Sequence, residues 1–472
     1  MNAETAYLFR HALLRDAAYQ LQMPGDRAKL HALAFEIVEH ESGGPAPLPP
    51  QAPGDSRWQP HPTDTFAAEL AVHAQLALVG EAVNRDALHA SQVKYVHRAA
   101  EIAEKVYRNE QALRLWQEHA LLTEGARQAE SFRRAGTVAK RFGQNQLSEQ
   151  LYSRALGIMR IVRNRVGEGL ALANLGLNHH ETGRMAEAES TYGEALAILR
   201  EQGAHGHEAG TLGNLAILYQ ETSRIGLAQQ VFEQALAAHR KVGDRRGEGI
   251  VLGNLGQLHE EQRNSALAQR YIEEALEIHR EVGNRPFEGI ALSNLAGICQ
   301  HSGRFQEALR LQQQALDVLQ QTGDRRYSGM ILANMAVVYA AINQDEQAVQ
   351  CGLSALAIHR EVGNRRGEGV ALGNLAGLYC AACDFKLAQS TYEQALAIHE
   401  RVGNRRFFGA HMAACALLEL AMENVQQARR RWRTAAGIVK SLGEPSLLAM
   451  ISSEMREACA KAGVPPFDEG AS

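Results

Sequence analysis

The sequence predicts an all-α protein, a right-handed α-solenoid of stacked helix-turn-helix units, and two observations support this class. A phrase of forty residues recurs without a gap: Gly203, Gly243, Gly283, Gly323, Gly363 and Gly403 fall on one another, with Arg163 as the variant first member. Two apolar stripes inside one phrase have helical spacing, first Leu372, Leu375, Ala376 and Tyr379, then Ala388, Tyr392, Ala395 and Leu396. We name these helix A and helix B. Gly363 suits the left-handed residue that ends a helix, and Asn364 suits the N-cap of the next helix A.

The stripe positions resemble the signature of the tetratricopeptide repeat (TPR). The usual TPR has about 34 residues, and six more fall here between helix B and the next helix A. This spacing is similar to the forty-residue subtype of the LGN/Pins polarity adaptors, with kinesin light chain a close relative. The resemblance is strong over residues 163–442 and weaker over 123–162. It implies a superhelix that binds protein on its concave surface.

Four other segments surround the array. Residues 1–40 are predicted to be helical, and residues 9–19, with Arg27 and His31, resemble the tail of the ATPase module of bacterial MalT-like or cyclase- and kinase-linked signalling proteins. Residues 41–64 hold seven of the twelve prolines and are expected to be a semi-extended linker. Residues 65–122 are expected to form a helical stalk with a degenerate repeat, 123–442 the array of forty-residue repeats, and 443–472 a capping helix and tail.

Composition sets limits on partners and compartment. The 472 residues carry a net charge of −4, which gives no general bias toward nucleic acid or membrane. The six cysteines are scattered without a disulfide pattern, and the N-terminus lacks a signal-type apolar core, so we expect a cytoplasmic protein. No apolar run reaches the length of a membrane span.

One asparagine per repeat is the main candidate for binding. The row consists of Asn174, Asn214, Asn254, Asn294, Asn334 and Asn374. At 100° per residue it lies about 150° from the leucine stripe of helix A, away from the core. In the similar adaptors, asparagines here hold the backbone of an extended peptide, and a carboxamide can donate to and accept from any peptide group. A structural ladder between neighbouring helices is the alternative, and both can hold at once.

A second row is acidic at one end of the array only. Glu181, Glu221 and Glu261 lie two helical turns beyond their asparagines, whereas the later equivalents are His301, Ala341 and Ala381. Basic groups of a ligand would gain Coulomb energy there, although an exposed row of charge can also be merely solvated. The lysines of the carboxylate-clamp TPR subtype are missing.

Other clusters give no catalytic site. The paired arginines of the loops, Arg245-Arg246 to Arg405-Arg406, lack interleaved aromatic residues, so nucleic acid is disfavoured. The histidine column at positions 239, 279, 359 and 399 is spaced too widely for zinc. No G-x-x-x-x-G-K-S/T loop occurs. We therefore expect no enzyme activity and no cofactor.

The sequence thus predicts a protein-protein interaction scaffold that binds a peptide segment of a partner in the concave groove. The alternative is the ligand-sensing regulatory half of a split or truncated ATPase signalling protein or transcription regulator. In that case the N-terminal segment docks on a separate ATPase module.

Overall fold

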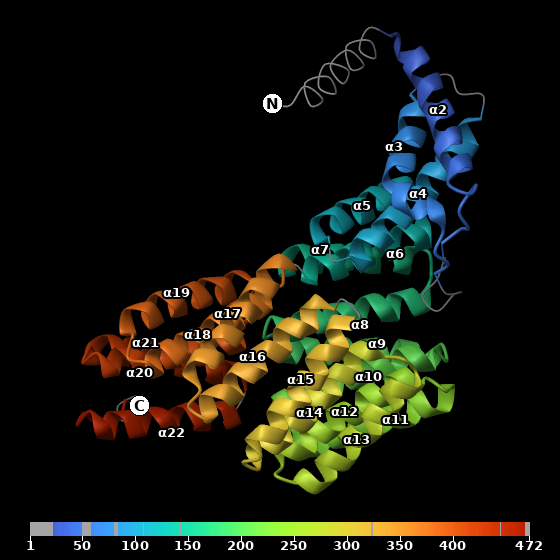
Figure 1. Ribbon diagram of the computed structural model, residues 1–472. Helices are drawn as coiled ribbons and strands as arrows, with labels where there is room; N and C mark the ends of the chain where they lie inside the picture. The colour runs from blue at the N-terminus through green and yellow to red at the C-terminus, as the bar shows by residue number, and fades with distance from the viewer. Residues whose placement is uncertain are drawn as a thin grey trace, which may run out of the picture. The chain divides into compact units, whose positions relative to one another are not determined.

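The computed structural model describes residues 22–49, 58–79, 84–106, 108–141, 143–321, 324–443 and 445–467 (Figure 1). Every regular element in these ranges is a helix, which confirms the all-α prediction. The chain divides into two compact units, Met1–Val138 and Ala139–Ser472, which we call the N-terminal unit and the array unit. Their boundary falls inside one helix, α6 (Gly125–Arg141).

Helices of unequal length make up the N-terminal unit. They are α2 (Pro24–Glu41), the 3-10 helix η1 (Pro62–Phe66), α3 (Ala67–Ala77), α4 (Arg85–Lys105), α5 (Asn109–Leu122) and most of α6. Helix α2 begins at Pro24, where a proline is tolerated because the first N–H groups of a helix have no partner within it. In the degenerate repeat Ala112 and Trp116 are buried, as expected for helix-B positions. Residues 9–19, which carry the ATPase-tail resemblance, lie outside the described residues.

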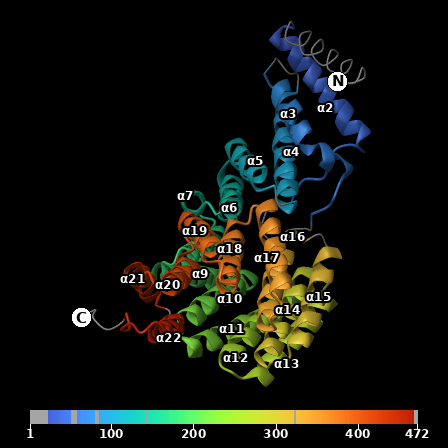
Figure 2. The same cartoon turned by 60° about the vertical axis from the view of Figure 1, so that its left-hand side comes forward.

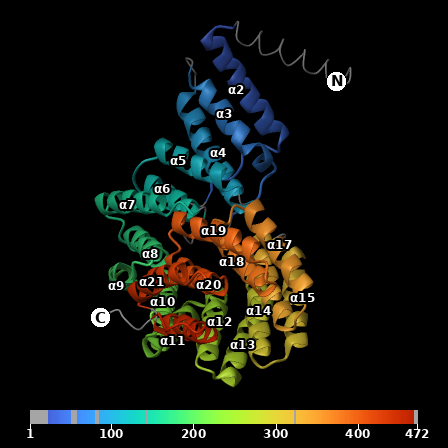
Figure 3. The ribbon, with the colours of Figure 1, turned by 90° about the vertical axis from the view of Figure 1, so that its left-hand side faces the viewer.

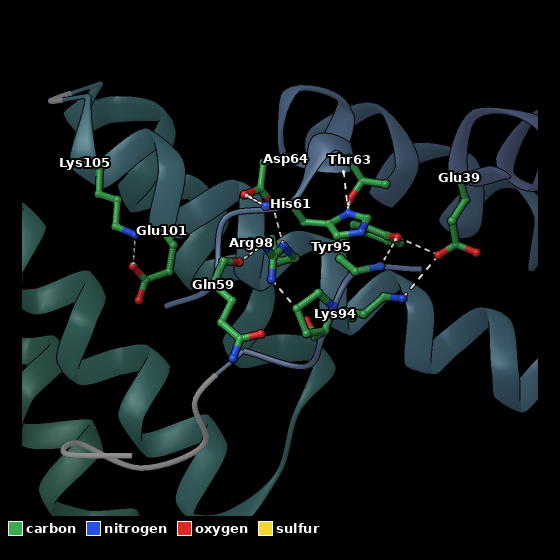
Figure 4. A network of polar contacts seen from close by, with 12 residues as sticks. Glu39, Gln59, His61, Thr63, Asp64, Lys94, Tyr95, Arg98, Glu101 and Lys105 are labelled. Carbon is green, nitrogen blue, oxygen red and sulfur yellow. Dashed lines mark hydrogen bonds and ion pairs between the residues drawn. The ribbon is translucent and has the colours of Figure 1, made fainter. Parts of the chain in front are cut away.

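The proline-rich segment, expected to be a semi-extended linker, is anchored to α4 where it is described. Arg98 of α4 is 1% exposed and lies between the two ends of this segment (Figure 4). Its guanidinium donates from Nε to Asp64 (2.6 Å), from Nη1 to the Pro47 carbonyl (3.1 Å) and from Nη2 to the Gln59 carbonyl (2.9 Å). The main-chain N–H of Ala46 also donates to the Tyr95 hydroxyl. Composition misses this because the partners are backbone carbonyls, which every residue carries.

Helix pairs of nearly constant length build the array unit. Helices A are α8 (Arg165–Glu181), α10 (His205–Glu221), α12 (Arg245–Glu261), α14 (Arg285–His301), α16 (Arg325–Ala341), α18 (Arg365–Ala381) and α20 (Arg405–Ala421). Helices B are α7 (Asn145–Ile161), α9 (Met185–Glu201), α11 (Ile225–Val242), α13 (Ser265–Glu281), α15 (Phe305–Gln321), α17 (Asp345–Glu361), α19 (Phe385–Arg401) and α21 (Val425–Leu442). The A helices begin forty residues apart, as the sequence period predicts.

Small residues let helices A and B approach closely. Two alanine columns on helix B are fully buried in repeat after repeat; the members from one repeat are Ala388 and Ala395, each 0% exposed. Gly363 is left-handed, with φ of 64°, and Asn364 caps α18 by accepting from the N–H of Gly367, as predicted. The turn from A to B also needs a left-handed residue, and Cys383 takes that conformation with φ of 60°. We did not expect this second left-handed position, because its residue type varies between repeats.

The ends of the array unit are covered in two ways. Helix α22 (Pro445–Lys461) packs Ile451, Met455 and Cys459 against α20 and α21. The superhelix also curls until its last helix pair lies beside its first ones (Figure 2, Figure 3). Asn145 of α7 donates to the Val402 carbonyl, and a Cβ added at Gly183 would lie 2.8 Å from Leu442. The array unit therefore closes on itself.

No described helix is both long and apolar enough to cross a membrane.

Candidate functional site: the inner face of the array

Helices A form the inner face of the superhelix. Each A helix contacts the A helix of the next repeat, as in the pairs α10–α12, α12–α14 and α14–α16. Residues 41 positions apart therefore meet across neighbouring repeats. Asn334 donates to Ser293 Oγ (3.0 Å), and the Lys140 ammonium lies 3.2 Å from Glu181. The spacing of 41 is the forty-residue period plus one residue. Pairs with this spacing recur between neighbouring A helices.

The asparagine row lies on this face. Asn174, Asn214, Asn254, Asn294 and Asn374 are partly buried and Asn334 is exposed. Asn334 is tied to the preceding A helix through Ser293, the arrangement of the structural-ladder alternative. Asn174 differs, because its Nδ2 is buried without a hydrogen-bond partner among the described residues. A buried amide nitrogen without an acceptor costs free energy, so it is suited to an incoming carbonyl.

The acidic row has partners within the chain. Glu181 lies near Lys140 of α6 and near Arg366 of α18, at 3.2 and 3.7 Å. Burial opposes its ionisation, but these two cations outweigh burial and hold the pKa of Glu181 below its ordinary value. Glu221 pairs with His180 Nε2 at 3.0 Å. Glu181 is therefore partly neutralised, and Glu221 is already hydrogen-bonded, before any ligand arrives.

Glu261 differs from the other two acids of the row. Burial raises the pKa of its carboxyl group, and the hydrogen bond from Gln220 and the charge of Arg406 only partly oppose this. The arginines that face the row, Arg366 and Arg406, come from the opposite end of the array. They lie in the first turns of α18 and α20 and not in the loops expected from the sequence. Two of the paired arginines thus face the acidic row because the superhelix closes. The sequence did not indicate this contact.

The histidine column has a packing role. A Cβ added at Gly249 of α12 would lie 2.6 Å from Cε1 of His279 on α13, so the ring fills the space that this glycine leaves. Burial lowers the pKa of His279 to about 4, which keeps the ring neutral. Among the described residues no three His, Cys, Asp or Glu side chains gather as metal ligands.

Two cavities were not foreseen. One of about 250 Å³ opens on the inner face between α12, α14 and α16, and Gln312 of α15 lines it. The other, about 850 Å³, lies within the N-terminal unit, where His97, Trp116 and His119 meet edge to face. Burial lowers the pKa of His97 to about 3 and that of His119 to about 4, so both rings are neutral. The first cavity had a signal in the sequence, because Gln312 occupies a helix-B position that carries a large apolar residue in most repeats. The second cavity had no such signal.

Three solved structures illustrate the similarity of this chain to other helical proteins. The Rap conjugation gene regulator of plasmid pLS20, solved with a peptide, shares 14% identity over 65% of this chain and 87% of its own, with a TM-score of 0.48. Aspartyl phosphate phosphatase F from Bacillus subtilis shares 14% over 65% and 77%, with a TM-score of 0.49. A signal transduction ATPase with a TPR sensor from Pyrococcus horikoshii shares 14% over 96% and 64%, with a TM-score of 0.43.

No curated protein matches the sequence. The family model of the tetratricopeptide repeat matches residues 127–201, 207–281, 287–361 and 330–401, which together exceed half of the chain. The chain belongs to the tetratricopeptide repeat family.

Proposed function

We infer that the array unit is a protein-interaction scaffold that binds an extended or helical segment of a partner along its inner face. The observation that carries this is the row of asparagine amides on helices A, one per repeat, with Asn174 Nδ2 buried and unpartnered. Such a row can bind the repeating carbonyl and N–H groups of a peptide backbone whatever its side chains. No group for catalysis or cofactor binding enters this proposal.

Small residues beside two of the asparagines leave room for a backbone, whereas at Gly373 the His411 ring fills the space. The residue before each asparagine is Ala173, Gly213, Gly253, Ser293, Ala333 or Gly373. A Cβ added at Gly213 or at Gly253 would meet nothing within 4 Å. The space above helices α10 and α12 is therefore open, which favours close approach of a chain there.

A triple variant tests the scaffold proposal. Peptides are selected from a displayed library of random linear sequences on the full chain, and their affinity is then measured for Asn214→Ala, Asn254→Ala and Asn294→Ala combined. Each lost hydrogen bond is worth about 0.5–1.5 kcal/mol, so affinity should fall about tenfold to a thousandfold. Melting should change little because alanine is the better helix former.

Asn334→Ala is the matched control. Its amide already bonds Ser293 of the preceding helix, so this single change should lower stability more than it lowers peptide affinity. Unchanged affinity in a well-folded triple variant would contradict the scaffold proposal.

A second candidate function has support in the N-terminal unit. Leu30, Leu33 and Ile37 of α2 are 45%, 52% and 53% exposed and lie on one side of the helix. An exposed apolar stripe of this kind suits docking on another protein, and we propose a separate ATPase module as the partner. Mixing the chain with a P-loop ATPase encoded beside it, with and without Leu33→Lys, tests this. If the Leu33→Lys chain forms the complex as well as the native chain does, the proposal that this stripe docks on an ATPase module is wrong.

We also propose a cytoplasmic location. All six cysteines are free, which suits a reducing compartment.

A further inference from the structure

One column of helix B carries a large apolar residue in six of eight repeats. It consists of Tyr152, Tyr192, Phe232, Ile272, Gln312, Gly352, Tyr392 and Trp432. Tyr192 and Phe232 are 0% exposed and belong to a hydrophobic cluster. At Gly352 the place of the missing side chain is taken by Leu375, which would lie 2.7 Å from an added Cβ. At Gln312 the column carries an amide, and a cavity of about 250 Å³ lies against it.

This cavity joins the inner face to the interior of the repeat. Its walls come from the A helices α12, α14 and α16, and Ile272 and Gln312 on helices B lie at its deep end. Asn294 and Asn334 of the asparagine row line its rim. Gly297 also lines it, and a Cβ there would meet nothing within 4 Å, so the entrance is unobstructed at that point. A backbone bound by the asparagines could therefore send one side chain inward.

Two oxygen atoms in the cavity have no partner among the described residues. Gln312 is 2% exposed, and its Oε1 is unpartnered. The Glu260 side chain is 14% exposed; its Oε1 lies 3.0 Å from Nδ1 of His301, but its Oε2 is buried without a partner. Buried polar atoms are nearly always hydrogen-bonded, so this pair indicates that donors are supplied from outside the chain.

The chemistry of these two oxygen atoms, Gln312 Oε1 and Glu260 Oε2, indicates which kind of donor suits the cavity. An ionised carboxylate only accepts hydrogen bonds, and bonds to a cationic donor are about twice as strong as neutral ones. The residues that line the cavity include no lysine or arginine. Its volume is below the roughly 300–1,000 Å³ usual for a free small-molecule ligand, which favours one side chain of a larger ligand.

We propose that this cavity is a specificity subsite for a basic side chain, lysine or arginine, of the segment bound in the groove. The subsite rests on the scaffold function proposed above. Glu260 supplies the charge, Gln312 supplies a second acceptor at the deep end, and Asn294 holds the backbone beside the entrance.

The test uses peptides selected from the random linear library on the full chain. The selected sequences should share a lysine or arginine at a fixed position, and changing that residue to methionine should weaken binding at least tenfold. Two variants block the subsite by different means. Glu260→Gln removes the charge, and Gly297→Leu fills the entrance where a side chain has room and where leucine is the better helix former.

Both variants should weaken the basic peptide at least tenfold, and Glu260→Gln should leave the methionine peptide unchanged. Glu273→Gln is the control, because Glu273 is an exposed carboxylate on α13 that accepts from Gln269, away from the cavity. It should bind both peptides as the native chain does. Whether lysine or arginine is enriched identifies the cation.

The outcomes separate the two proposals. Peptides that depend on the asparagine row but show no basic position, or that bind both subsite variants normally, would overturn the subsite and leave the scaffold standing. Failure to select any peptide that depends on the asparagine row would overturn the scaffold and the subsite together.

Discussion

Replacing Arg98 by alanine should release both described ends of the proline-rich segment. The guanidinium is 1% exposed and bonds Asp64, the Pro47 carbonyl and the Gln59 carbonyl, and it stacks at 4.2 Å over the ring of Trp58. Removing one partner of a buried ion pair costs about 3–5 kcal/mol because the other charge stays buried. Arg98→Lys keeps the charge, but a single ammonium cannot match the three-way geometry, so part of the loss should remain.

Hydrogen exchange followed by mass spectrometry resolves this effect by region. In the native chain the N–H of Ala46, which is bonded to Tyr95, and the N–H of His61, which is bonded to Asp64, should be protected. In Arg98→Ala their exchange should be faster by about a hundredfold or more, if opening becomes easier by at least 3 kcal/mol. The array unit should exchange as before.

Lys105→Ala is the control on the same helix. The substitution removes the same charge as Arg98→Ala, and Lys105 also lies over the Trp58 ring, at 4.0 Å. The Lys105 side chain, however, is 49% exposed, and its ammonium lies 3.9 Å from Glu101. An exposed pair contributes about 0–1 kcal/mol, so protection should barely change. Equal exchange in Arg98→Ala and in Lys105→Ala would refute the anchoring role of Arg98.

Three further predictions concern the array unit. Cys383→Gly should raise the thermal midpoint slightly, because a left-handed residue with a Cβ costs about 1–2 kcal/mol and the extra entropy of glycine returns about half of that. Stability should fall from pH 6.5 toward pH 4 in thermal scans, because burial lowers the pKa of His279 and His359 to about 4 and the unfolded chain then binds more protons; a flat profile would contradict this. Arg366→Glu places like charges beside Glu181 and should expand the array in small-angle scattering, whereas Arg304→Glu, outside the contact, should not.

Features that depend on local period were predictable from the sequence. The forty-residue phrase places the start of every A helix, and the left-handed Gly363 and the capping Asn364 follow from the same register. The inward direction of the asparagines also follows, because 100° per residue fixes their angle from the leucine stripe. The A-to-B turn escaped notice because residues as different as Arg263, Asn343 and Cys383 adopt its left-handed conformation.

Features that depend on curvature could not be predicted in this way. The contact of Glu181 with Arg366 joins residues 185 positions apart in the chain, and it exists because small rotations between successive repeats add up until the ends meet. The pairing of residues 41 apart is simpler, since it requires only that A helices stack. It brings Lys140 to Glu181 and His180 to Glu221, but no local pattern in the sequence marks such pairs.

The cavity at Gln312 illustrates how a repeat protein can separate fold from binding. Positions that hold the fold are filled by similar residues in each repeat, so Tyr192 and Phe232 serve as internal references for the size that the core accepts. Gln312 in that column buries less apolar surface and leaves its Oε1 acceptor unpartnered. Both effects lower the stability of the fold. Sites that break a local rule in this way are where function is expected. The same column also explains why Gly352 is no second subsite, because Leu375 already occupies its space.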